Sequence, residues 1–469
     1  MRGHTIPRLA GPRSAALLGA ALVGLASPAA HAQSTNPGIS IGPSQELSPA
    51  TAPPPPPVEH LLPDYGGYRA SLARVGITLQ LNYIAEVAGN VTGGTKRSSS
   101  YAGQVGFEAD IDWEKLANVK GLTTHVVIVN RQGSNVGTNF GDTLNQVQEI
   151  YGAGGDTVVH LVYAYAEESL LNGRVNLAVG RAPELNDFSA SPLYCNFINN
   201  SLCGNPKALP ESDVGFSSYP DAVFFGRVRV RPTADTYIQA GVYEVNQSIY
   251  SYPVYRSGFT FNGSRDSGVM IPVEAAYEPT IGPQAMPGHY KVGFGYDTST
   301  YPKFLSTPNS VLAGGRSNGT DNKYGAWALA DQMVFRNGPG ATDGLILLAG
   351  YVHTNPAVSN YTNQAFFGAL YKNFLPSRPQ DTIGFLFNYA NISGALGNEQ
   401  GLERAFGLPV VGSSTRATQK SQEIIELNYN IHVTQGVSFQ PLFQYYFRPN
   451  GVSNIPDAAI FGFKSNITF

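Results

Sequence analysis

The chain has 469 residues, of which 13% are charged and 42% are hydrophobic. Beyond residue 32 no uninterrupted apolar stretch reaches about 18 residues, which excludes a helical membrane protein, and the hydrophobic content excludes a disordered chain. The formal net charge of −3 provides no basic surface for phosphate, so a nucleic-acid-binding protein is excluded as well. A β-rich protein remains, including one whose apolar surface faces lipid.

The first 32 residues have the pattern of a secretory signal peptide. Arg2, Arg8 and Arg13 precede an apolar segment at 15–26, and Ala30-His31-Ala32 forms a small-x-small cleavage site. The apolar segment is about a dozen residues long, which is too short for a transmembrane anchor. We therefore expect cleavage after Ala32.

Residues 33–62 have the composition of a linker. Proline, serine, glycine and alanine dominate, and the unbroken run from Pro53 to Pro57 favours an extended polyproline II conformation. We expect a periplasmic spacer. Binding of a partner or of the cell wall is a second interpretation of the same composition.

From residue 77 the dominant hydrophobic period is two. Ile77, Leu79 and Leu81 alternate with Thr78 and Gln80, which places the two sets on opposite faces of a strand. Similar segments continue to the end of the chain. We expect sixteen strands, at 77–88, 101–112, 122–130, 159–168, 174–181, 222–231, 236–243, 269–278, 289–296, 324–334, 344–352, 365–372, 382–391, 421–432, 436–447 and 458–469.

The connections between these segments are of two kinds. Compact ones lie at 113–121, 169–173, 232–235, 279–288, 336–343, 373–381 and 433–435, and long ones at 131–158, 182–221, 244–268, 297–323 and 392–420. Short periplasmic turns, long extracellular loops and an even strand count are typical of transmembrane barrels. The sequence therefore predicts an all-β fold, a transmembrane antiparallel β-barrel of sixteen strands over residues 63–469.

The last predicted strand ends in an aromatic residue. Phe461, Phe463, Ile467 and Phe469 alternate with small or polar residues. Outer-membrane barrels present such a strand to their insertion machinery, so we expect that machinery, outer-membrane lipid and lipopolysaccharide as partners. The pattern is also that of an ordinary closing strand, and both interpretations can hold.

Several short motifs resemble those of one protein family. They are Asp64-Tyr65-Gly66-Gly67-Tyr68-Arg69 with Gly76-Ile77, Cys195 and Cys203 with Gly204-Asn205-Pro206, Ala330-Asp331-Gln332-Met333, Arg378-Pro379-Gln380-Asp381-Thr382-Ile383-Gly384, and Gln440-Pro441 through Gln444-Tyr445 to Pro449-Asn450-Gly451. Together they resemble the carbohydrate-selective outer-membrane porins (OprB-like) over residues 64–469. Two positions depart from the family pattern, namely Tyr65, where tryptophan is expected, and Asn450, where glycine is common.

The resemblance implies passive uptake of glucose and related sugars across a Gram-negative outer membrane, without a cofactor or metal. A general diffusion porin without sugar selectivity is the alternative. An anion channel is disfavoured, because removing the three leader arginines from the 30 basic residues leaves 27 against 33 acidic ones. Enzymatic activity is not expected, since neither Gly-x-Ser-x-Gly nor His-Glu-x-x-His occurs. The oligomeric state stays open.

The longest connection, at 182–221, is the third extracellular loop if the N-terminus is periplasmic, and in sixteen-stranded porins this loop folds into the lumen. Cys195 and Cys203 lie on it in an oxidising compartment, so we expect a disulfide that stiffens the loop. Metal ligation is the alternative, although no histidine or further cysteine is nearby. Candidate pore residues on this loop are Glu184, Asn186, Asp187, Phe188, Tyr194, Asn196, Phe197, Asn199 and Asn200.

Three arginines alternate with valines in the predicted strand at 222–231. Arg227, Arg229 and Arg231 are expected to line the interior, because a charge facing lipid at the midplane costs about 2–4 kcal/mol. The rigid guanidinium fork also suits sugar hydroxyls. Acids expected at inward positions opposite this ladder are Glu86, Glu108, Asp110, Glu168, Glu274 and Glu426. Alternatively, any of these charges is paired within the wall and does not touch substrate.

Overall fold

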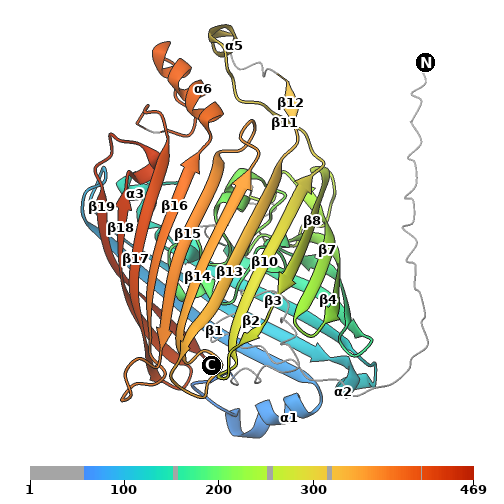
Figure 1. Ribbon diagram of the computed structural model, residues 1–469. Coiled ribbons are helices and arrows are strands. Elements are labelled where there is room, and N and C mark those ends of the chain that lie inside the picture. The colour runs from blue at the N-terminus through green and yellow to red at the C-terminus, as the bar shows by residue number, and fades with distance from the viewer. Residues whose placement is uncertain (1–57, 152–156, 251–256, 314–318, 414) are drawn as a thin grey trace, which may run out of the picture.

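A computed structural model describes residues 58–151, 157–250, 257–313, 319–413 and 415–469, and within them sixteen long strands close an antiparallel barrel (Figure 1). β1 (Ile77–Thr92) pairs with β2 (Ser99–Asp112) and also with β19 (Ala458–Thr468), and this second pairing closes the barrel. The wall between them consists of β3 (Leu122–Gly133), β4 (Thr157–Leu170), β5 (Val175–Ala182), β6 (Val223–Thr233), β7 (Thr236–Asn246), β8 (Asp266–Tyr277), β10 (Met286–Asp297), β13 (Tyr324–Arg336), β14 (Gly344–Thr354), β15 (Tyr361–Lys372), β16 (Thr382–Ile392), β17 (Ser421–Thr434) and β18 (Val437–Phe447).

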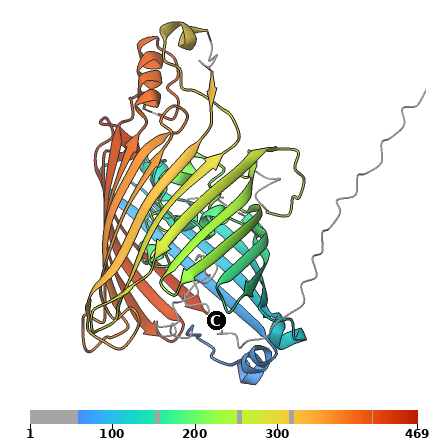
Figure 2. The same cartoon turned by 45° about the vertical axis from the view of Figure 1, so that its right-hand side comes forward.

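The short elements lie at the two ends of the barrel or inside it. The end with compact connections, here the turn end, carries η1 (Tyr65–Gly67), α1 (Tyr68–Arg74), α2 (Trp113–Ala117) and β9 (Thr280–Ile281). At the opposite loop end, α5 (Pro308–Leu312), α6 (Gly394–Ala405), β11 (Tyr301–Pro302) and β12 (Thr320–Asp321) rise above the wall (Figures 1 and 2). The loops also contain α3 (Val136–Phe140), η2 (Glu149–Tyr151), η3 (Glu184–Asn186), η4 (Tyr194–Asn196), α4 (Ala208–Ser212) and η5 (Pro449–Gly451). No helix within the described residues is long and apolar enough to cross a membrane.

The predicted barrel is confirmed, and each of the sixteen predicted segments overlaps a strand. Several strands are longer than expected at the loop end. For example, β1 continues past residue 88 because Gly89 and Asn90 still pair with β19. The predicted signal peptide at 1–32 and residues 33–57 of the predicted linker lie outside the described residues. Leu61, near the end of that linker, donates its backbone N–H to Thr468 O at the turn end (2.8 Å).

The alternating sequence pattern sorts the side chains between the two faces of the wall. On β1, Leu79 and Leu81 are 36% and 40% exposed on the outer face, whereas Gln80 and Asn82 point inward and are buried. An apolar outer face with polar residues inside is the arrangement that a barrel adopts in lipid. The interior is not empty, however, because two loops fold into it.

Candidate functional site

Loop 3 (183–222) enters the barrel between β5 and β6 and is bound to the neighbouring wall by its first turns. Asp187 accepts hydrogen bonds from Gln239 Nε2 through its backbone oxygen (2.7 Å) and from Tyr243 through its carboxylate (3.1 Å). Ser189 N donates to Glu274 Oε2 (3.0 Å). These contacts fix the start of the loop against β7 and β8.

The middle of loop 3 reaches the opposite wall. Glu426 on β17 accepts hydrogen bonds from the backbone N–H of Ile198 (2.9 Å) and of Asn199 (2.8 Å). Gln440 on β18 donates to the backbone oxygen of Asn196 (2.7 Å). Loop 3 therefore spans the lumen, and its green trace lies within the barrel in both views (Figures 1 and 2).

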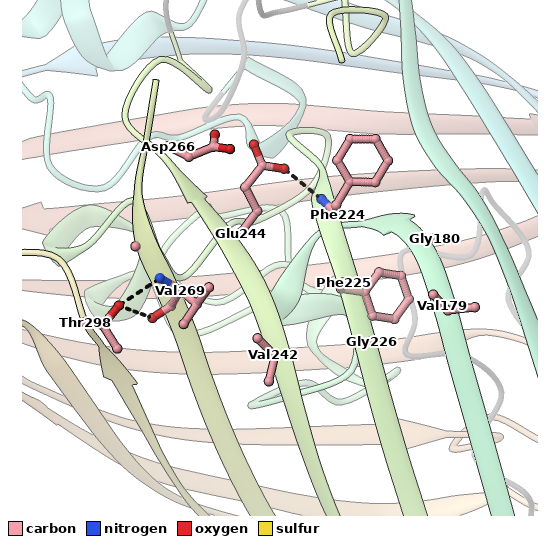
Figure 3. A pocket seen from close by; sticks show the side chains of 11 residues that line it. Val179, Gly180, Phe224, Phe225, Gly226, Val242, Glu244, Asp266, Val269 and Thr298 are labelled. Atoms are coloured by element: carbon pink, nitrogen blue, oxygen red, sulfur yellow. Dashed lines mark hydrogen bonds between the residues drawn. The ribbon is translucent and has the colours of Figure 1, made fainter. Parts of the chain in front are cut away.

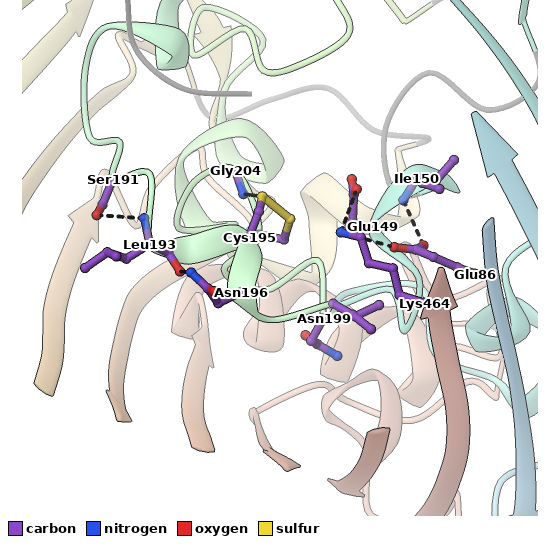
Figure 4. The surroundings of a disulfide bond; sticks show 12 residues. Glu86, Glu149, Ile150, Ser191, Leu193, Cys195, Asn196, Asn199, Gly204 and Lys464 are labelled. Carbon is purple, nitrogen blue, oxygen red and sulfur yellow. Dashed lines mark hydrogen bonds and ion pairs between the residues drawn. A yellow bond between two sulfur atoms is a disulfide. The ribbon is translucent and has the colours of Figure 1, made fainter. Parts of the chain in front are cut away.

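The two cysteines are joined in a disulfide, the pairing expected from the sequence (Figure 4). Cys195 belongs to η4, and Cys203 lies on the following turn, directly after the residues that bind β17. Gly204 N donates to Cys195 Sγ (2.9 Å). The bridge thus closes a short ring in the segment of loop 3 that crosses the lumen.

A second loop also folds inward, which the sequence did not predict. In loop 2, described over residues 134–151, Gln148 Nε2 donates to Glu86 O (3.0 Å), and Asn145 O accepts from the Tyr446 hydroxyl (2.8 Å). Gln146 O accepts from Asn200 N of loop 3 (3.0 Å). The two loops therefore support each other within the lumen.

A small polar slot lies between the two loops. Its rim includes Glu149 of loop 2 together with Asn200, Lys207, Ser218 and Tyr219 of loop 3, and the disulfide residue Cys203 borders it. Its volume of about 20 Å³ is close to that of a single water molecule. The slot can therefore take a hydroxyl group but not a sugar ring.

Charged wall residues converge next to this slot. Arg131 on β3 donates from Nε to Gln104 Oε1 (2.7 Å), and its guanidinium lies 5.0 Å from the centre of the Tyr219 ring. Arg131 Nη2 is 3.8 Å from Glu149 Oε2. Lys464 Nζ lies 3.8 Å from Glu149 Oε1 and 3.9 Å from Glu86 Oε1 (Figure 4). We call the slot, Arg131, Glu86 and Lys464 together the constriction.

The predicted arginine ladder faces the interior, and each guanidinium is paired with an acid. Arg227 Nε is 3.3 Å from Asp187 Oδ2, and Arg229 Nη2 is 4.0 Å from Asp187 Oδ1. Arg231 Nη1 lies 2.8 Å from Glu278 Oε2. The three residues are 3–7% exposed. This placement joins the ladder to loop 3 and to the wall; contact of these arginines with substrate stays a prediction.

One expected inward acid lies on the other face. Glu168 on β4 is directly opposite Leu177 on β5, and opposite residues in an antiparallel pair share a face. Leu177 is 41% exposed on the outer surface, so the inward prediction for Glu168 was wrong. Its neighbour Glu167 takes the inward position and lies 3.6 Å from Arg227.

The other predicted acids of the wall point inward. Glu274 accepts hydrogen bonds from Tyr237, Gln239 and Trp327, in addition to that from loop 3. Asp110 Oδ1 lies 2.6 Å from His125 Nδ1. Glu108 is 6% exposed on the same face of β2.

Three further loop 3 candidates, Asn186, Phe188 and Phe197, are buried rather than pore-lining. Phe188 has no exposed surface and packs edge-on against Tyr243, so the expected stacking platform is not formed by this ring. Asn186 is 7% exposed and accepts a hydrogen bond from the Tyr163 hydroxyl. Phe197 is also fully buried. These side chains belong to the core that packs loop 3 against the barrel wall.

Glu184 has an unusual environment at the start of loop 3. Its side chain is fully buried, and no described residue donates a hydrogen bond to either carboxyl oxygen. Burial, together with the nearby Glu274 and Asp187, raises the pKa of Glu184 well above its ordinary value. Protonation of this carboxyl therefore stabilises loop 3 in its position inside the barrel.

The sequence of this chain matches the family model described as "Carbohydrate-selective porin, OprB family" over residues 96–469. It is 27% identical over 422 residues to Porin B of Pseudomonas aeruginosa, covering 87% of this chain and 91% of that protein. It is also 27% identical over 421 residues to the putative porin QuiX of Acinetobacter baylyi, covering 87% of this chain and 93% of that protein. The high-pH structure of Pseudomonas putida OprB superposes with a TM-score of 0.80 at 26% identity, covering 88% of this chain and 99% of that one.

Proposed function

Because the chain belongs to the OprB family of carbohydrate-selective porins, it is a channel of the bacterial outer membrane, and we propose that glucose-sized sugars cross it passively past the constriction. Diffusion through a selective pore requires contacts that favour entry and are weak enough to permit exit. Hydrogen bonds to sugar hydroxyls at a polar rim meet this requirement. No energy source or cofactor enters the proposal.

The observation that carries the proposal is the pairing of Arg131 with Tyr219 beside the slot. Gln104 and Glu149 orient the guanidinium, and the Arg131 side chain is 1% exposed, so it holds Tyr219 and Glu149 in position at the rim before a sugar arrives. Such preorganisation reduces the entropic cost of binding. Because the slot accepts only a hydroxyl, the sugar ring would lie against the rim while one hydroxyl enters.

The arginine ladder has a positioning role in this proposal. Arg227 and Arg229 hold Asp187, and Asp187 begins the segment that crosses the lumen. Among the expected candidates, Glu274 holds the start of the same loop and Glu426 holds its middle. The shape of the pore then depends on these residues.

Swelling of proteoliposomes tests the sugar preference. Purified protein is reconstituted, and swelling rates are compared for glucose, sucrose and an amino acid matched to glucose in mass as nearly as possible. We expect the order glucose, then amino acid, with sucrose slowest. If solutes of similar mass enter at equal rates, the chain is a general diffusion porin and the proposed selectivity is wrong.

A further inference from the structure

The turn end of the barrel carries a segment that belongs to no strand. The wall presents apolar side chains to lipid, as Val179 and Val242 do beside Gly226 (Figure 3). At the turn end, residues 59–69 lead into α1, which Figure 1 shows at the same end as the C mark. We call residues 59–69 the strap. None of them is buried, so polar contacts and not a hydrophobic core hold the strap in place.

The strap reaches the end of β19 from two directions. Leu61 N donates to Thr468 O (2.8 Å), and His60 Nδ1 lies 2.8 Å from Phe469 O. From α1, Arg69 Nη2 donates to the same Phe469 oxygen over 2.7 Å. Arg69 and Phe469 are 400 residues apart in the sequence. The contact therefore forms only when the two ends of the barrel wall have come together.

The turn between β17 and β18 leaves room for the strap. Gly436 in this turn has a φ of +68°, and a Cβ atom built there would lie 2.3 Å from Leu61 N. Only glycine combines this backbone conformation with so close an approach. Beside the turn, Glu59 Oε2 lies 2.6 Å from His432 Nε2 on β17. The strap is thus fitted to the wall on this side of β19 as well.

The position of Phe469 depends on closure of the barrel. Phe469 N donates to Leu81 O on β1 (2.8 Å), next to the residues through which β1 pairs with β19. Before this pairing β19 has a free edge, and a free strand edge readily pairs with another chain. The insertion machinery, expected as a partner from the sequence, would bind this edge. After closure, His60 and Arg69 bind the end of the same edge.

We propose that the strap is a latch that ends assembly. It binds Thr468 O and Phe469 O once β1 has paired with β19, and it thereby displaces the insertion machinery from the end of β19. Because none of its residues is buried, the strap can stay detached until closure without exposing a core. This inference does not rest on the proposed sugar preference, since loops 2 and 3 take no part in it.

Assembly in vitro tests the latch. The full chain without its predicted signal peptide is added unfolded to proteoliposomes that contain purified insertion machinery, and the barrel still captured with the machinery is counted over time. We expect the double variant His60→Ala, Arg69→Met to form a barrel but to stay bound about tenfold longer, which corresponds to roughly 1.4 kcal/mol in the barrier to release. The matched control is Arg74→Met, because the Arg74 guanidinium donates to Ala70 O and Ser71 Oγ within α1. This control should leave the machinery as the wild type does.

Heat-dependent mobility in gel electrophoresis separates release from stability. If the double variant leaves the machinery at the wild-type rate but unfolds at a lower temperature, the strap only stabilises the finished barrel and the proposal is overturned. A double variant that forms no barrel overturns it too, because a latch that acts after closure is not needed for closure. Glu59→Gln, which weakens only the contact with His432, should lengthen the bound time by a smaller factor. A longer delay than in the double variant would contradict the role given to Phe469 O.

Discussion

Arg227 Nε on the wall lies 3.3 Å from Asp187 Oδ2 on loop 3, with 0% and 2% of the two side chains exposed. This ion pair is one of the contacts through which the barrel wall holds the loop that narrows the lumen. Removing one partner of such a buried pair leaves an uncompensated charge, at a cost of about 3–5 kcal/mol. Loss of this pair should therefore disturb the position of loop 3 more than the stability of the barrel, because each strand of the barrel is hydrogen-bonded to both of its neighbours.

Loss of the Arg227 side chain should open the pore. We expect Arg227→Met to raise single-channel conductance and to reduce the difference between glucose and sucrose in swelling rate, because loop 3 loses its attachment to β6. Arg231→Met is the matched control, since it breaks a buried pair with Glu278 that does not involve loop 3. If both variants conduct as the wild type does, the ion pair does not position the loop.

The disulfide should limit motion in the segment of loop 3 that crosses the lumen. Closing this ring reduces the conformational freedom of the residues between Cys195 and Cys203. We expect the double variant Cys195→Ser, Cys203→Ser to form a barrel but to show a noisier open channel and a smaller ratio of glucose to sucrose swelling. A reductant should produce the same change in the wild type and none in the double variant. An unchanged ratio in both would show that the hydrogen bonds to Glu426 suffice.

The barrel could be predicted from the sequence because every strand in a lipid bilayer needs an apolar outer face. The alternation at Leu79 and Leu81 and in the final strand follows from this requirement, and the short and long connections are those of a membrane barrel. The alternation is uninformative where two consecutive residues are equally polar. At Glu167 and Glu168 the pattern does not identify the inward residue, and an error of one residue reverses the face.

The interior of the barrel was less predictable, because it is held by contacts that are distant in sequence. Loop 2 is attached through Asn145, which donates to Gln422, and no local pattern links these two residues. The charges of the constriction left a weak signal, however. Arg131 lies one residue beyond the predicted strand at 122–130, and Lys464 lies in the middle of β19. Both occupy inward positions that the alternation along β3 and β19 identifies.

The buried carboxyl of Glu184 should make stability depend on pH. Because the folded state raises its pKa, the bound proton stabilises the fold fully below the ordinary pKa, and this contribution is lost as the pH rises through the raised value. We expect Glu184→Gln to raise the unfolding temperature at pH 8 by roughly 1–3 °C and to change it little at pH 4. The unfolding temperature is measured from the heat-dependent mobility of the barrel in gel electrophoresis. Glu211→Gln, on the same loop but 30% exposed, should show no such difference between the two pH values.

Sugar affinity should depend on the guanidinium shape of Arg131 and not on its positive charge alone. Arg131→Lys keeps the charge but loses the fork that Gln104 orients and the contact with Tyr219. We expect ion conductance to change little, while the glucose concentration that half-blocks the current rises roughly tenfold, because Tyr219 and Glu149 lose the group that holds them at the rim. Arg229→Lys, whose side chain is bound to Gln239 within the wall, should leave the half-block concentration unchanged. A larger effect at Arg229 than at Arg131 would place the sugar beside the ladder instead.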